Sequence, residues 1–170
     1  MRTLIVGGAA SGKSVLAEKL LLASPGPHHY VATLRGCDAE CRSKIEKHRN
    51  RRRNTDIDTV ECPTDIGRLC FEDYGTVLLE CLTTLAANEM FDSTGQVSDP
   101  SDKILEGIEH LARHSAELIV VSNTVGEDLP ISLSDMTLLY VRLLGRLNCE
   151  LAGRFDKVYE MHCGSAIQIK

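Results

Sequence analysis

The segment from Gly7 to Ser14 constrains the fold of this chain more than any other. Its sequence, GGAASGKS, fits the pattern G-x-x-x-x-G-K-[ST] of a phosphate-binding loop. Glycines let the backbone turn its N–H groups toward an anion, and the helix that follows presents the positive end of its dipole. The apolar run Thr3–Val6 precedes the loop, and apolar residues recur at helical spacing after Lys13. This order of strand, loop and helix predicts nucleotide binding.

Two residues of this segment, called the phosphate loop below, have specific expected roles. Lys13 is expected to reach the β- and γ-phosphates, and the Ser14 hydroxyl to ligate Mg²⁺. The residues expected to contact the nucleotide are Gly7, Gly8, Ala9, Ala10, Ser11, Gly12, Lys13 and Ser14. A second apolar strand, Val77–Leu79, ends in Glu80, which is expected near the metal or its water; the alternative is a helix-capping or surface glutamate.

Apolar patterns of period two and period 3.6 alternate along the chain. The expected strands are Thr3–Val6, His29–Thr33, Thr76–Leu82, Glu117–Ser122, Lys157–Met161 and Ala166–Ile169. Helices are expected from Lys13 to before Pro25, from Asp38 toward Asn50, over Ser101–His114 and over Ser134–Ala152, with a loop at Asp92–Pro100. The alternation predicts a three-layer α/β fold with a mostly parallel central sheet. No repeat or linker divides the 170 residues, so a single domain over residues 1–170 is expected.

The charge of the chain is distributed unevenly. The net charge is −5, but residues 42–53 hold seven basic residues and one acid, which gives that segment +6 and the remainder −11. A single basic block on an acidic body suits one small anionic ligand better than a nucleic acid. His48 lies inside this block, where neighbouring cations disfavour the imidazolium and keep the ring neutral and nucleophilic. The alternative is a solvated basic helix with an incidental histidine.

Several classes of protein do not fit the sequence. No apolar run has the roughly 20 residues of a membrane-spanning helix. Seven scattered cysteines without a C-x-x-C pair, and no secretory leader, predict reduced thiols and a cytoplasmic protein. The N-K-x-D base-reading motif of switch-type GTPases is absent, which favours a transferase. A small-molecule kinase without a covalent nucleotide, or a non-catalytic nucleotide-binding subunit, remains an alternative.

A set of motifs in a fixed order resembles one known family, the bifunctional adenosylcobinamide kinase / adenosylcobinamide-phosphate guanylyltransferases of cobalamin biosynthesis. The motifs are the phosphate loop, Tyr30-Val31-Ala32-Thr33, Lys44-Ile45-x-x-His48-Arg49, Thr59-Val60-Glu61, Leu79-Glu80-Cys81-Leu82-Thr83-Thr84, Asn123-x-Val125-Gly126, Gly145-Arg146-x-Asn148 and Gly164 before Ile169-Lys170. Together they span nearly the whole chain, and the ordered set is far more specific than the phosphate loop alone.

The resemblance implies two reactions. A nucleoside triphosphate, ATP or GTP, phosphorylates the aminopropanol hydroxyl of adenosylcobinamide. A histidine then attacks the α-phosphate of GTP, and the GMP passes to the substrate phosphate to give adenosyl-GDP-cobinamide. On this sequence the guanylylated residue is His48, which occupies the histidine position of the I-x-x-H-R motif.

The resemblance also implies further site residues and an assembly. The nucleotide-binding positions are Ala32, Thr33, Leu34, Glu61 and Glu80, and the residues lining the phosphates are Arg49, Asn50, Arg51 and Arg52. Family members resemble RecA-type ATPases in fold and are typically trimeric, so a RecA-like P-loop NTPase fold and a homo-oligomer are expected. A corrinoid is the expected small-molecule partner.

The chain departs from the family pattern at several positions. Arg53 stands where the family usually has a proline, and the chain has no tryptophan. This chain carries Thr124 where the Asn-Glu-Val-Gly segment of the family has a glutamate. The usual Arg-Asp pair of the family is replaced around Val141-Arg142. The resemblance implies that these positions lie on the substrate side, which leaves a guanylyltransferase-only enzyme as a further alternative.

Overall fold

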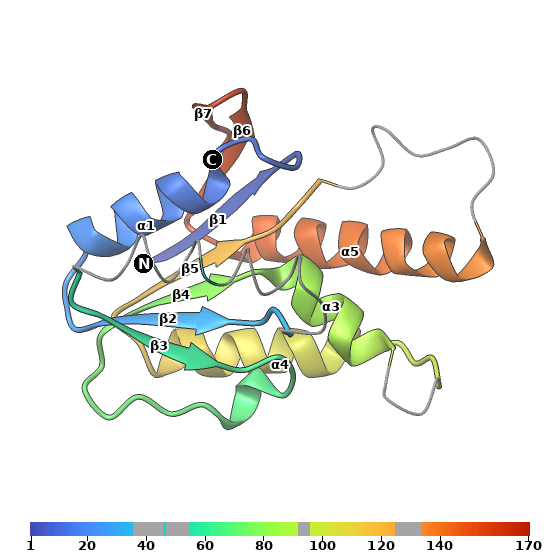
Figure 1. Ribbon diagram of the computed structural model, residues 1–170, viewed down its shortest axis with the longest axis horizontal. Helices are drawn as coiled ribbons and strands as arrows, with labels where there is room; N and C mark the ends of the chain where they lie inside the picture. Colours follow the sequence, from blue (N-terminus) through green and yellow to red (C-terminus); the bar gives the residue numbers. More distant parts are fainter. Residues whose placement is uncertain (36–45, 47–54, 92–95, 125–133) are drawn as a thin grey trace.

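A seven-stranded sheet forms the centre of the protein (Figure 1). The computed structural model describes residues 1–35, 46, 55–91, 96–124 and 134–170. The strands are β1 (Arg2–Gly7), β2 (His28–Ala32), β3 (Ile57–Glu61), β4 (Thr76–Glu80), β5 (Glu117–Val121), β6 (Lys157–His162) and β7 (Ser165–Gln168). The helices are α1 (Lys13–Ala23), α3 (Leu82–Met90), α4 (Ser101–Arg113) and α5 (Asp135–Arg154), with a short 3₁₀ helix, η1 (Ile66–Arg68).

The strand order is β3-β2-β4-β5-β1-β6-β7. All neighbouring strands are parallel except β6 and β7, which form an antiparallel hairpin. Parallel strands end at the same edge of a sheet, and ligands of open α/β sheets bind outside that carboxyl edge. The ends of β1, β2, β3 and β4 therefore lie along one edge.

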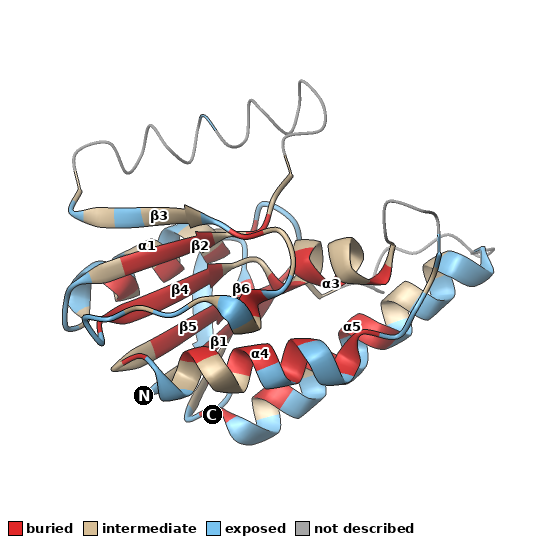
Figure 2. Cartoon of the chain, turned by 90° about the horizontal axis from the view of Figure 1, so that it is seen from below, coloured by how far each residue is buried: buried red, intermediate tan, exposed pale blue. Residues whose placement is uncertain are grey.

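Helices cover both faces of the sheet, which makes three layers. On one face, α3, α4 and α5 pack against alternate strand residues such as Leu4, Val77 and Val120 (Figure 2). On the other face, α1 places Ala17 and Leu21 against Ile5 and Leu78. Because strand side chains alternate between faces, each central strand supplies residues to both cores. Burial on both faces is the reason the central strands read as continuous apolar runs.

The predicted fold class is confirmed: the chain is a three-layer α/β protein with a mostly parallel sheet. The strand predicted over Thr76–Leu82 extends too far, because β4 ends at Glu80, and the helix α3, which begins at Leu82, was not predicted. Threonines at 83 and 84 disfavour a helix locally, but Leu82, Leu85, Ala86 and Met90 are buried, and this packing decides the local structure.

Two further parts of the chain differ from the prediction or cannot be compared with it: the strand β3 and the helix predicted in the basic segment. The strand β3 was not predicted because it lies at the sheet edge, where the exposed Asp58 and Glu61 interrupt the apolar pattern. The helix predicted from Asp38 toward Asn50 lies outside the described residues except for Glu46. Among the described helices, none is long and apolar enough to cross a membrane.

Gly75 provides a test of the packing at the start of β4. A Cβ added at Gly75 would lie 2.1 Å from the Pro27 carbonyl oxygen, a backbone atom that accepts the Thr76 N–H. Gly75→Ala is therefore expected to lower the free energy of unfolding by about 1–3 kcal/mol, as overpacked cores do. Urea denaturation followed by circular dichroism measures this change.

Gly145 is the matched control for Gly75. It lies inside α5, and a Cβ added there meets nothing within 4 Å. Gly145→Ala is expected to raise the free energy of unfolding by about 0.5–1 kcal/mol, because alanine restricts the unfolded chain and favours the helix. Equal stability of the Gly75→Ala variant and the parent would contradict the packing described here.

Candidate active site

The phosphate loop turns sharply between β1 and α1. Gly7 has φ +150° and Gly12 has φ +98°, backbone conformations that residues with a side chain rarely adopt. A Cβ on Gly7 would also lie 2.6 Å from the Met161 carbonyl oxygen. The turn is held from outside by two backbone hydrogen bonds, from Thr124 N–H to the Gly7 oxygen (3.1 Å) and from Gly164 N–H to the Ser11 oxygen (3.0 Å). The end of β5 and the β6–β7 hairpin therefore fix the shape of the loop.

Lys13 lies across the loop. Its ammonium group donates to the Gly8 carbonyl oxygen and, at 3.4 Å, to the Ser11 hydroxyl. The residue is only 7% exposed, and this burial lowers the pKa of Lys13, while the nearby Glu80 carboxylate partly opposes the change. A phosphate at the loop would replace the carbonyl as the partner of this ammonium and would favour its charged form.

Ser14 and Glu80 meet although 66 residues separate them. The Ser14 hydroxyl donates to Glu80 Oε1 at 2.5 Å. Ser14 is on the first turn of α1, and Glu80 ends β4 on the face of the sheet that α1 covers. A hydroxyl and a carboxylate are the hard oxygen ligands that Mg²⁺ prefers, so the pair fits the predicted metal site.

The predicted residues of β2, β3 and β4 form one row. Ala32 pairs in register with Glu61 on one side and with Glu80 on the other. Residues opposite one another in a parallel sheet project to the same face. Glu61, Ala32 and Glu80 therefore project together at the carboxyl edge, on the α1 side.

Thr33 joins this row to the start of α3. Its buried hydroxyl donates to the Cys81 carbonyl at 2.9 Å and accepts the Cys81 N–H at 2.8 Å. Its own N–H donates to the Glu80 carbonyl at 3.0 Å. Burial raises the pKa of the Cys81 thiol, which stays protonated beside Thr84. Leu34 follows Thr33, is half-buried and belongs to no strand.

The end of β5 is tied to α3 and α5. Asn123 N–H donates to the Thr83 hydroxyl (2.9 Å), and the Asn148 amide donates to the Asn123 carbonyl (3.1 Å). Tyr140 donates to the Thr83 carbonyl (2.9 Å), and burial raises the pKa of Tyr140 to about 12. Two motifs 25 residues apart in the sequence, around Asn123 and Asn148, thus meet beside the phosphate loop.

The structure brings most of the predicted residues to one edge of the sheet. The phosphate loop, Ala32, Thr33, Leu34, Glu61 and Glu80 all lie there. His48, Arg49, Asn50, Arg51 and Arg52 lie outside the described residues. Sequence reasoning missed Cys81 and Tyr140 as parts of the site, because each acts through a contact that only the folded chain creates.

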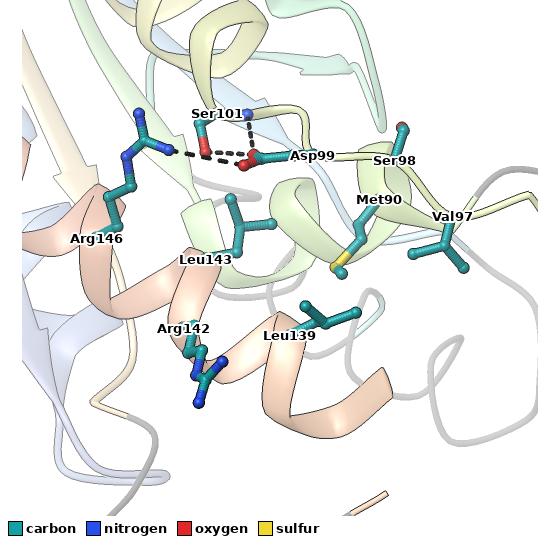
Figure 3. A pocket seen from close by; sticks show the side chains of 9 residues that line it. All are labelled: Met90, Val97, Ser98, Asp99, Ser101, Leu139, Arg142, Leu143 and Arg146. Carbon is teal, nitrogen blue, oxygen red and sulfur yellow. Dashed lines mark hydrogen bonds and ion pairs between the residues drawn. The ribbon is translucent and has the colours of Figure 1, made fainter. Parts of the chain in front are cut away.

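A separate cavity of about 330 Å³ opens between α3, α5 and residues 97–101 (Figure 3). Its walls are largely apolar, with Met90, Leu139 and Leu143 among them. Asp99 accepts hydrogen bonds from the Ser101 hydroxyl and from the Ser101 N–H (2.9 Å) and pairs with Arg146 at 3.6 Å. These contacts, the hydroxyl first, hold the pKa of Asp99 below its ordinary value. None of the lining residues belongs to the phosphate loop.

The loop, its lysine and the parallel sheet define a nucleotide-binding α/β protein of the phosphate-loop class. A family model described as cobinamide kinase / cobinamide phosphate guanyltransferase matches residues 3–169. The chain therefore belongs to this family.

Curated relatives cover the chain from end to end. The bifunctional adenosylcobalamin biosynthesis protein CobU of Escherichia coli (strain K12) is 31% identical over 185 residues, with all of both chains covered. The bifunctional adenosylcobalamin biosynthesis protein CobP of Pseudomonas aeruginosa is 32% identical over 173 residues, with 100% of this chain and 98% of the relative covered.

Solved structures show a more distant likeness. The P4 protein from bacteriophage phi6 in complex with ADP covers 97% of this chain and 52% of its own, at 15% identity and a TM-score of 0.45. The RadB recombinase covers 94% of this chain and 73% of its own, at 14% identity and a TM-score of 0.48.

Substitution of Lys13 tests the phosphate loop. Lys13→Ala is expected to weaken binding of Mg²⁺–ATP by about 10- to 100-fold, because a hydrogen bond to a charged group contributes about 1.5–3 kcal/mol. Titration calorimetry measures the dissociation constant. Lys19, an exposed lysine further along α1, is the control, and Lys19→Ala should bind as the parent does. Equal losses in the two variants would contradict a specific role for Lys13.

Proposed function

We propose that this chain, acting as one domain, phosphorylates adenosylcobinamide and then transfers GMP from GTP to the adenosylcobinamide phosphate. Membership of the family supports both reactions. The observation that carries the proposal is the meeting of Lys13, Ser14 and Glu80 at the edge where β2 and β3 also end. This edge offers groups for the phosphates and, beside them, strand ends for the nucleoside.

In the kinase reaction, the aminopropanol hydroxyl oxygen of the corrinoid attacks the γ-phosphorus of ATP or GTP and loses its proton to solvent. The bond from that phosphorus to the β,γ-bridging oxygen breaks, and ADP or GDP leaves with the electron pair. Phosphoryl transfer depends mainly on positioning and on stabilising charge on the phosphate oxygens. In the proposed arrangement, Lys13 and the backbone N–H groups from Gly8 to Ser14 bind these oxygens. Ser14 and Glu80 would hold Mg²⁺, which neutralises phosphate charge when bound.

In the guanylyl transfer, a nitrogen of His48 attacks the α-phosphorus of GTP. A P–N bond forms, the bond from the α-phosphorus to the bridging oxygen breaks, and pyrophosphate leaves with that electron pair. An oxygen of the corrinoid phosphate then attacks the same phosphorus, the P–N bond breaks, and the histidine is regenerated. The basic residues at 49, 51 and 52, with Asn50, would bind the phosphates during both steps, and Ala32, Thr33, Leu34 and Glu61 the nucleoside.

The covalent step gives the sharpest test of this function. Incubation with Mg²⁺ and GTP labelled at the α-phosphate should label the protein, and the label should be acid-labile and alkali-stable. His48→Asn should abolish the label. His114→Asn should retain it, because His114 is an exposed residue that follows α4, before β5 begins at the opposite edge of the sheet.

Other outcomes would identify other functions. Absence of label together with phosphorylation of cobinamide would indicate a kinase without a covalent nucleotide. Label and GMP transfer without phosphorylation of cobinamide would indicate a guanylyltransferase alone. Nucleotide binding without either reaction would indicate a regulatory subunit and would contradict the proposal.

We also propose a cytoplasmic homo-oligomer, a trimer by resemblance to the family, that takes a small corrinoid and no nucleic acid. Three large apolar side chains support an assembly, because Met136, Leu138 and Leu139 near the start of α5 are 41%, 37% and 47% exposed. Such neighbouring exposed apolar residues are typical of contact surfaces. Sedimentation equilibrium should give three times the monomer mass of 18.7 kDa, and a monomer at micromolar concentration would contradict the proposal.

A further inference from the structure

Asn88 on α3 makes an unusual pair of contacts across the carboxyl edge of the sheet. Its amide nitrogen donates to the Thr33 carbonyl oxygen at 2.8 Å and to the Pro63 carbonyl oxygen at 2.9 Å. Both partners are acceptors, so the two N–H groups of the amide are both used. Among side chains of this length, only the NH₂ group of asparagine supplies two donors without a charge.

The two carbonyls belong to the segments that leave adjacent strands. Thr33 directly follows β2, and Pro63 comes two residues after the end of β3. The last rung between the strands is the hydrogen bond from Cys62 N–H to the Ala32 carbonyl, at 2.8 Å. Beyond this hydrogen bond the sheet no longer connects the segments that follow β2 and β3, and Asn88 bridges these two segments instead.

The bridge extends to the phosphate loop. Thr33 is bonded through its hydroxyl and its N–H to the backbone of Glu80 and Cys81. Glu80 in turn accepts the Ser14 hydroxyl. A continuous set of hydrogen bonds therefore runs from Pro63 through Asn88, Thr33 and Glu80 to the first turn of α1.

The neighbouring residue on α3 makes contacts of a different kind. Glu89 accepts the Asp65 N–H at 2.6 Å and pairs with Lys103 of α4 at 2.9 Å. These contacts hold η1 and α4, and they do not involve β2, β4 or the phosphate loop. Substitution of Glu89 therefore removes support of the segment after β3 but leaves the bridge made by Asn88 in place.

We propose that Asn88 is a positioning residue for the guanine nucleotide. It fixes the ends of β2 and β3, with Thr33, Leu34 and Glu61, at a set distance from the phosphate loop. This inference rests on the proposed guanylyl transfer at the same edge. Loss of the bridge should impair the placement of GTP for attack on its α-phosphate more than the binding of a triphosphate to the loop.

The test uses the full-length protein with Asn88→Ala, the isosteric Asn88→Asp, and Glu89→Ala as the matched control. Aspartate keeps the shape of asparagine but replaces both donors with oxygen, which faces two carbonyl oxygens. The measurements are the rate of protein labelling at saturating α-labelled GTP, the dissociation constants of Mg²⁺–GTP and Mg²⁺–ATP, and the melting temperature.

Both Asn88 variants are expected to label about 10- to 100-fold more slowly, since small displacements of reacting groups cause losses of this size. Their affinity for GTP should fall relative to that for ATP, while Glu89→Ala should lose thermal stability without either change. A labelling rate within twofold of the parent would overturn the inference. So would equal losses in GTP affinity, ATP affinity and melting temperature, which would indicate a purely structural role.

The outcome for the parent protein separates this inference from the proposed function. If the parent forms no label, the guanylyl transfer fails as a function. The role of Asn88 is then decided by the ratio of GTP to ATP affinity: an unchanged ratio in Asn88→Ala overturns it, and a lowered ratio supports it.

Discussion

The parallel register of five strands is the constraint on which the candidate site depends. It aligns Glu61, Ala32, Glu80, Val121 and Ile5 in one row across β3, β2, β4, β5 and β1. The phosphate loop begins two residues after Ile5, so the loop and the three predicted positions of this row share an edge. A shift of any strand by one residue would turn its side chains to the other face and separate Glu80 from Ser14.

Hydrogen bonds beyond the strand ends fix the position of the backbone at this edge of the sheet. Sheet pairing ends with the last backbone hydrogen bond of each strand. Beyond it, short polar side chains form hydrogen bonds with the backbone: Thr33 after β4, Asn88 after β2 and β3, and Thr83 and Asn148 after β5. Each satisfies backbone groups that would otherwise be left without partners near a buried edge. The same contacts determine where the residues proposed to bind the nucleoside lie relative to Lys13.

The sequence predicted the parts of this arrangement that depend on local pattern. The phosphate loop, the central strands and α1, α4 and α5 follow from glycine spacing and apolar periodicity, and the motif order gave the family. The helix α3 was not predicted, because Thr83 and Thr84 disfavour a helix locally and only the burial of Leu82 and Leu85 in the fold decides it. Asn88 and Tyr140 could not be found from the sequence, since their roles depend on carbonyl groups brought close only by folding.

We propose that the carboxyl edge of the sheet binds the nucleotide for both reactions. A crystal structure with Mg²⁺ and a GTP analogue that has a β,γ-imido bridge tests it most directly. We expect the triphosphate to lie against Lys13 and the backbone of the phosphate loop, with the guanosine at the ends of β2 and β3. A nucleotide bound instead in the cavity between α3 and α5, with the phosphate loop uninvolved, would contradict it.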